Sequence, residues 1–205
     1  MKQLIFVLMI SSSCSAQEKF NFEFENTHSY NSIIQFEKQQ NSINTGFHYF
    51  RVSMNSYFID MVPTVDPYTL IFQRKDDSFT PGLSTWYFFD SDSICRGFQY
   101  NWSFFAPDFN QSENLPILEK EFSRKKEYRL KYREVLGVLK SLIGQPTTTK
   151  KAGNRSDFYA EMATWDFPLF RTILVVQFDP RIIEIPGTEI INGGLSTVTV
   201  QTFMK

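Results

Sequence analysis

Cysteine, histidine and long apolar runs are scarce in this chain of 205 residues. Two cysteines cannot build the dense disulfide framework of small secreted scaffolds. The two histidines, His28 and His48, have no Cys or His partner at the spacing of a zinc site. The longest apolar run, Leu4 to Ile10, is too short for a membrane helix, which needs about 20 apolar residues. A formal net charge of -1 provides no global field that would attract a polyanion or a membrane.

The first sixteen residues have the features of a cleaved export signal. Lys2 supplies a positive start, the apolar run follows it, and small residues lead to a cleavage site between Ala16 and Gln17. We therefore expect residues 1–16 to be removed and the mature protein to be exported to the periplasm, the outer membrane or the extracellular space.

Cys14 gives the same segment a second interpretation. It could be the acylated cysteine of a bacterial lipoprotein, which would tether the mature chain to a membrane, and the intact mass of the mature protein distinguishes the two cases. Either outcome leaves Cys95 as the only other cysteine. A lone cysteine in a strand-like run is typical of a small buried hydrophobe, so packing must replace disulfides.

Aromatic residues make up 17% of the chain, and most fall in short alternating runs that favour strands. A hairpin is expected over Thr85 to Phe105, around the polar tetrad that begins at Asp90. Further strands are expected at Phe20–Phe24, Ser32–Phe36, Gly46–Val52, Tyr68–Gln73, Ala163–Phe167, Thr172–Phe178, Ile182–Ile185 and Ser196–Phe203. The segment from Gln145 to Asp157 has the composition of a polar, basic connector, and we find no internal repeat.

One long helix is predicted from about Ile117 to Ile143, with Gly144 as its stop signal. Its second half carries an apolar stripe that would dock on a sheet, where Gly137 would allow close approach to a strand. Its first half has a weaker apolar pattern, and the stretch from Arg124 to Lys131 is expected to be more exposed.

The predicted fold is α+β: a largely antiparallel sheet packed against this one long helix, with a β-rich N-terminal region before it. Residues 17–205 are expected to form a single domain, with a sub-division near residues 81–84 as the alternative.

A short signal that ends in Ala16-Gln17, ahead of a chain rich in Asn, Phe and Lys, resembles exported proteins of the Bacteroidota. The order of hairpin, long helix ending in Gly-x-Pro and later antiparallel strands, between Thr85 and Phe203, resembles small α+β domains of bacterial envelope proteins. The resemblance implies a location and brings no catalytic motif with it.

Positive charge is concentrated between Glu119 and Arg155, a segment that contains eleven Lys and Arg residues but only four Glu residues. Such asymmetry indicates an interaction face, although it is also typical of the solvated side of a helix. The candidate binding residues are Lys120, Arg124, Lys125, Arg129, Lys131, Lys150, Lys151 and Arg155. The expected partner is an acidic protein, an acidic glycan or a lipid head group, because export argues against nucleic acid. Changing Lys125, Arg129 and Lys131 to Glu is expected to leave folding intact and to weaken capture of the partner.

No catalytic, cofactor-binding or metal-binding motif is found, so the expected function is a non-enzymatic binding or accessory module of the envelope or secreted fraction. The alternative is a hydrolase that uses two carboxylates on an extracellular polymer. Its candidate acids are Asp76, Asp77, Asp90, Asp92, Asp157, Glu161 and Asp166.

Trp86, Trp102 and Trp165 either line a sugar-binding face or belong to the core. In a eukaryotic host, Asn101, Asn110 and Asn154 would be glycosylation acceptors.

Overall fold

The computed structural model describes residues 29–49, 68–76, 79, 82–89, 93–103, 123–155, 158–178, 182–184, 191–193 and 196–204. The export segment, the predicted strand at Phe20–Phe24, His28 and the tip of the predicted hairpin lie outside these residues. The elements are α1 (Tyr30–Gln39), β1 (Ile43–Tyr49), β2 (Tyr68–Arg74), β3 (Leu83–Phe89), β4 (Cys95–Ser103), α3 (Lys125–Ile143), β5 (Thr148–Arg155), β6 (Phe158–Asp166), β7 (Phe170–Phe178), β8 (Ile182–Glu184), β9 (Ile191–Gly193) and β10 (Thr197–Met204).

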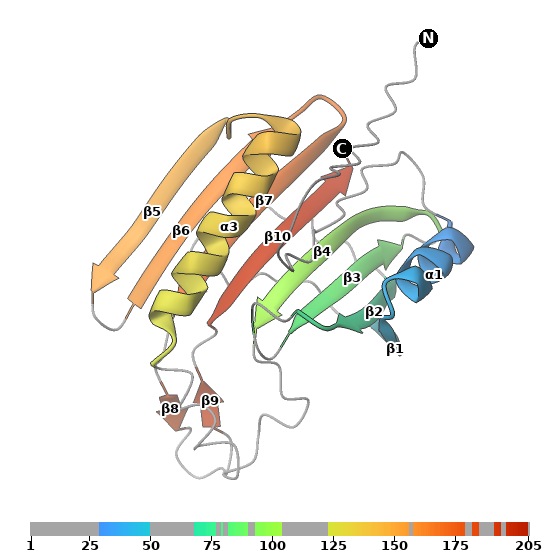
Figure 1. Cartoon of the computed structure of the whole chain (residues 1–205), viewed down its shortest axis with the longest axis horizontal. Helices are drawn as coiled ribbons and strands as arrows, with labels where there is room; N and C mark the ends of the chain where they lie inside the picture. Colours follow the sequence, from blue (N-terminus) through green and yellow to red (C-terminus); the bar gives the residue numbers. More distant parts are fainter. Residues whose placement is uncertain are drawn as a thin grey trace, which may run out of the picture.

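Eight strands form one antiparallel sheet in the order β1-β2-β3-β4-β10-β7-β6-β5, and β8 pairs with β9 separately. Figure 1 shows both described helices in front of this sheet, with α1 near β2 and β3 and α3 over the other half. The α+β class and the antiparallel sheet are confirmed. The expectation of one long helix is not, because α1 is a second helix on the same face.

The order of elements contains a repeat that the sequence did not reveal. A helix followed by four strands of the sheet occurs twice, first as α1 with β1 to β4 and then as α3 with β5, β6, β7 and β10. The second half lies in the sheet as the reverse of the first, so the last strands β4 and β10 meet in the centre. Equivalent positions differ in chemistry: Trp86 lies beside Gln99, while Ile173 lies beside Gln201.

Helix α1 replaces the strand predicted at Ser32–Phe36. The Ser29 hydroxyl accepts a hydrogen bond from the backbone N–H of Ser32 at 3.3 Å, which is the geometry of an N-cap. Ile33 and Glu37, one turn apart, are both buried against the sheet. The cap and the helical spacing outweigh the strand preference of the isoleucines.

Helix α3 ends at Ile143, as predicted, and Gly144 follows with φ +86° while its N–H bonds to the carbonyl of Lys140 at 3.1 Å. It begins at Lys125, after a turn at Ser123 and Arg124, and not at Ile117, while residues 117–122 lie outside the described part of the chain. The predicted length was therefore wrong.

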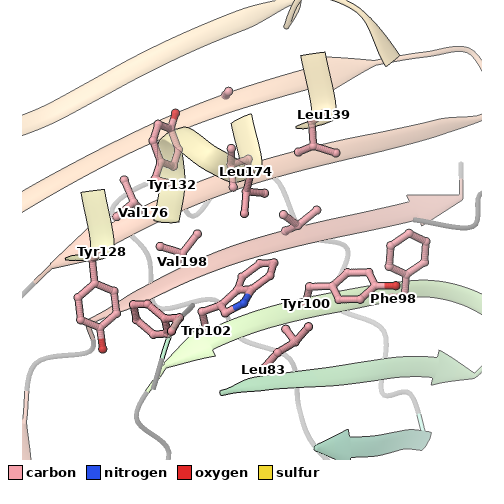
Figure 2. Packing of buried hydrophobic residues seen from close by; sticks show 14 of the residues in the cluster. Leu83, Phe98, Tyr100, Trp102, Tyr128, Tyr132, Leu139, Leu174, Val176 and Val198 are labelled. Atoms are coloured by element: carbon pink, nitrogen blue, oxygen red, sulfur yellow. The ribbon is translucent and has the colours of Figure 1, made fainter. Parts of the chain in front are cut away.

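The main core lies between α3 and the sheet, and Figure 2 shows its central side chains. Tyr132, Val135 and Leu139 of the predicted apolar stripe are buried, and they pack in one cluster with Trp102 and Leu174. Tyr128 and Lys131 are buried as well. The expectation that Arg124 to Lys131 is an exposed stretch is therefore wrong at these two positions, which face the sheet.

Gly137 lies on the solvent side of α3, and no atom lies within 4 Å of the place where a Cβ would be. The predicted close approach to a strand is wrong.

We expect Gly137→Ala to raise the free energy of unfolding by about 1 kcal/mol, because alanine loses less backbone entropy in a helix. Urea denaturation measures the change. Gly97→Ala is the contrasting variant, and it should destabilise the fold because the new Cβ would lie 2.6 Å from the Thr202 carbonyl. A lower free energy of unfolding in Gly137→Ala would contradict the expected gain.

The predicted connector from Gln145 to Asp157 contains β5, the edge strand that pairs with β6. The segment can be a strand although it is polar and basic, because lysines at the edge of a sheet discourage pairing with other chains. Lys150 and Lys151 interrupt the apolar alternation that marks a strand in the sequence.

Cys95 is a buried cysteine at the start of β4, as expected. Neither of the helices in the described ranges is long and apolar enough to cross a membrane.

Candidate functional site

Three of the predicted cations lie at two neighbouring side chains of β6: Lys125 and Arg129 at Tyr159, and Lys151 at Glu161. The guanidinium carbon of Arg129 lies 4.8 Å from the centre of the Tyr159 ring, and the ammonium of Lys125 lies 5.9 Å from it. The Tyr159 hydroxyl donates a hydrogen bond to the Glu161 carboxylate. Lys151 pairs with the same carboxylate at 3.5 Å. We call these five residues the basic corner.

Local structure explains the arrangement. Lys125 and Arg129 are four residues apart, so they lie on the same side of α3. Tyr159 and Glu161 are two residues apart in β6 and therefore point to the same face of the sheet. Lys151 lies directly opposite Glu161 in the β5–β6 register. Residues that are distant in the sequence thus meet on the helix-covered face.

Lys151 on β5 is the most exposed cation of the basic corner: its side chain is 73% exposed, whereas that of Glu161 is 16% exposed and Lys125 and Arg129 are half-buried. Burial, followed by the hydrogen bond to Glu161 and its charge, raises the pKa of Tyr159 to about 12. Tyr159 is therefore a neutral hydrogen-bond donor at pH 7. With three cations and one carboxylate, the basic corner suits a carboxylate, sulfate or phosphate group.

Tyr132 lies one turn after Tyr128 on the buried side of α3 (Figure 2). Burial first, and then the charge of Glu161, raises its pKa well above the ordinary value. Its hydroxyl has no hydrogen-bond partner among the described residues. Tyr132 therefore adds an unused donor beneath the basic corner.

Lys131 does not belong to this surface. Its side chain is 2% exposed, and its ammonium lies 3.0 Å from Asp76 Oδ2 and 3.1 Å from Glu134 Oε2. The indole N–H of Trp102 donates to the same Asp76 oxygen at 2.7 Å. The lysine thus neutralises a buried carboxylate and links α3 to the end of β2. Reversing its charge would place it against Asp76, so the expectation that the triple reversal leaves folding intact does not hold for Lys131.

The other predicted cations lie apart from the basic corner or outside what is described. Arg124 pairs with Glu127 at 2.8 Å and lies 4.8 Å from the centre of the Phe79 ring. Lys150 points to the opposite face from Lys151, because successive side chains of a strand alternate. Lys120 and the side chain of Arg155 are outside the described part of the chain.

The carboxylates proposed for hydrolysis are each held by a cation where they are described. Asp76 pairs with Lys131, Glu161 with Lys151, and Asp166 with Arg171 at 3.1 Å. Asp77, Asp90, Asp92 and Asp157 lie outside the described residues. Three of these acids thus have a structural partner that accounts for their position.

Sequence reasoning missed Tyr159 as a member of the site. The signal was present, since tyrosine and glutamate two residues apart share one face of a strand. It could not be used because β6 was predicted to begin at Ala163, while the strand begins at Phe158. The described ranges hold no group of three or more His, Cys, Asp and Glu side chains placed to bind a metal ion. No protein-family model, curated protein or solved structure matches this chain.

Proposed function

We propose that this protein is an exported, non-enzymatic binding or accessory module that holds an anionic partner at the basic corner. The observation that supports the proposal is that Lys125 and Arg129 of α3 lie over Tyr159 while Lys151 of β5 pairs with Glu161, the hydrogen-bond partner of Tyr159. The concentration of positive charge between residues 119 and 155 favours the same face. An arginine and two lysines beside a tyrosine hydroxyl suit a carboxylate or phosphate group on a protein, glycan or lipid head group.

The double variant Lys125→Glu/Arg129→Glu tests this proposal. It spares Lys131 and therefore leaves the buried ion pair intact. We expect capture of partners from native envelope material to fall by about tenfold or more, because two attractive charges become repulsive. Capture by the unmodified protein should also weaken as salt is added, since exposed charges are screened.

The matched control is Lys38→Glu/Lys140→Glu, which changes the net charge equally on two helices but outside the basic corner. We expect it to capture the same partners as the unmodified protein. Thermal unfolding of both variants verifies the fold. Equal capture by the two double variants would refute the role of the basic corner.

A further inference from the structure

The turn between β6 and β7 carries four apolar residues in a row, Phe167, Pro168, Leu169 and Phe170, which we call the apolar tip. Leu169 is 72% exposed, more than any other exposed large apolar side chain of the described residues, and Pro168 is exposed as well. Turns of this kind usually carry Gly, Asn, Asp or Ser, which favour the turn backbone. The turn itself therefore does not require a leucine at its most exposed position.

The apolar tip is held in one shape. The Phe167 N–H donates a hydrogen bond to the Phe170 carbonyl at 3.0 Å and closes the turn. At its base, the Arg171 guanidinium donates two hydrogen bonds to the Asp166 carboxylate, both at 3.1 Å. The centres of the Phe167 and Phe170 rings lie 4.7 Å apart, and Phe167 packs against the main core. Leu169 is thus presented to solvent by a preformed turn, which lowers the entropic cost of binding.

The apolar tip lies where α3 and β10 end. The indole N–H of Trp165 donates to the Gly144 carbonyl at 2.8 Å, which places the end of α3 beside the β6–β7 turn. Met204, near the end of β10, lies opposite Phe170 and is half-buried. Figure 1 shows the ends of α3 and β10 at the same end of the sheet as this turn. Because the basic corner lies at the beginning of α3, the two surfaces are at opposite ends of that helix.

Positive charge accompanies the apolar tip. The two segments that meet at this end, residues 140–150 and 162–173, contain Lys140, Lys150 and Arg171 but only one acid, Asp166. Arg171 is the partner of Asp166, so the two lysines make the charge at this end positive. An exposed apolar group with cations near it is complementary to a surface that is apolar below and negatively charged above.

The small size of the apolar tip decides between a lipid surface and a second copy of the chain. A stable protein interface takes about 800 Å² from each partner, and a four-residue turn offers only a small part of that area. A lipid bilayer needs no complementary pocket, since attachment to it increases with the apolar area inserted and with attraction to anionic head groups.

We propose that the apolar tip inserts into the head-group region of an anionic lipid bilayer. Leu169 and Pro168 enter the layer first, while Lys140 and Lys150 lie nearer the head groups than the basic corner does. The contact is weak and reversible, because one turn buries little apolar area. It is a second binding surface and does not depend on the proposed function of the basic corner.

Flotation of the mature chain from Gln17 to Lys205, produced without lipid, with vesicles tests the proposal. We expect it to bind vesicles that contain phosphatidylglycerol, and to bind phosphatidylcholine alone more weakly. Affinity should fall about tenfold or more in Leu169→Gln, the size expected when one leucine is no longer buried. Leu130→Gln makes the same change at a leucine that is 53% exposed on α3, and this matched control should bind normally. Thermal unfolding verifies the fold of both variants.

Leu169→Trp measures the insertion directly. Vesicles with brominated acyl chains should quench the fluorescence of the added indole, because quenching requires contact with the lipid chains. Leu130→Trp is the matched control, and the fluorescence of its added indole should not be quenched.

Three results would overturn this inference. The first is no binding to phosphatidylglycerol vesicles, and self-association that is lost in Leu169→Gln would then assign the apolar tip to a second copy. The second is unchanged affinity in folded Leu169→Gln. The third is loss of vesicle binding in Lys125→Glu/Arg129→Glu while Leu169→Gln still binds, which would place the lipid at the basic corner and support the proposed function instead.

Discussion

Lys131→Met is expected to lower the free energy of unfolding by about 3–5 kcal/mol, as measured by urea denaturation. Methionine can fill much of the space of the lysine stem, but it removes the ammonium from the buried Asp76 carboxylate. The Trp102 indole still donates to Asp76, and a neutral donor does not replace the ammonium. The cost therefore comes from the lost ion pair of a buried charge and not from lost packing.

Lys126→Met is the matched control, because it makes the same chemical change on the exposed side of the same helix. We expect an effect below about 0.5 kcal/mol there. Adding Asp76→Asn to Lys131→Met should recover part of the loss, since the buried carboxylate charge is then removed. Equal effects of Lys131→Met and Lys126→Met would show that the ion pair does not stabilise the fold.

Arg74→Met is expected to have an effect of similar size, about 3–5 kcal/mol, at the other end of the sheet. Glu37 on α1 is fully buried and receives two hydrogen bonds from Arg74, at 2.9 and 2.5 Å. Tyr87 and Ser42 also donate to this carboxylate. The arginine lies 5.3 Å from the centre of the Tyr100 ring, so its loss also removes a cation–π contact.

Hydrogen exchange distinguishes the expected mechanism in Arg74→Met from general damage. Because Glu37 joins α1 to β2 and β3, the amides of α1 should lose protection first, while those of α3 keep theirs relative to global stability. Lys38→Met, next to Glu37 but exposed, is the control and should change neither helix. Uniform loss of protection across both helices would contradict a local anchoring role for Arg74.

The strands that could be predicted from the sequence are those with strong local patterns. Thr172–Phe178 was expected to be a central strand, and β7 lies between β10 and β6. The two strands of the predicted hairpin pair as β3 and β4. In both cases short-range preferences and the fold agree, so no tertiary information was needed.

The remaining features depend on contacts that the sequence does not display. Helix α1 depends on the Ser29 cap and on a buried glutamate that pairs with Arg74, 37 residues further along the chain. Strand β5 depends on its position at the sheet edge, where lysines are favourable. From local sequence patterns alone, α1 was predicted to be a strand and β5 to be part of a connector.

The candidate site could be predicted only in part for the same reason. The sequence shows the concentration of positive charge, but it does not show which cations are buried and which lie at the basic corner. Lys131 faces Asp76, while Lys125 and Arg129 lie at Tyr159. Lys150 and Lys151 separate to opposite faces once they belong to a strand. Charge counted along the sequence therefore overstated the surface available to an anionic partner.

The central pairing of β4 with β10 also has a kinetic consequence. Gln99 and Gln201, which meet there, are 102 residues apart in the sequence, whereas the pairs within each half are formed between strands closer along the chain. Closing so long a loop is entropically costly, and folding slows as contacts become more distant in sequence. We therefore expect the seam between the two halves to form late in folding, after the pairs within each half.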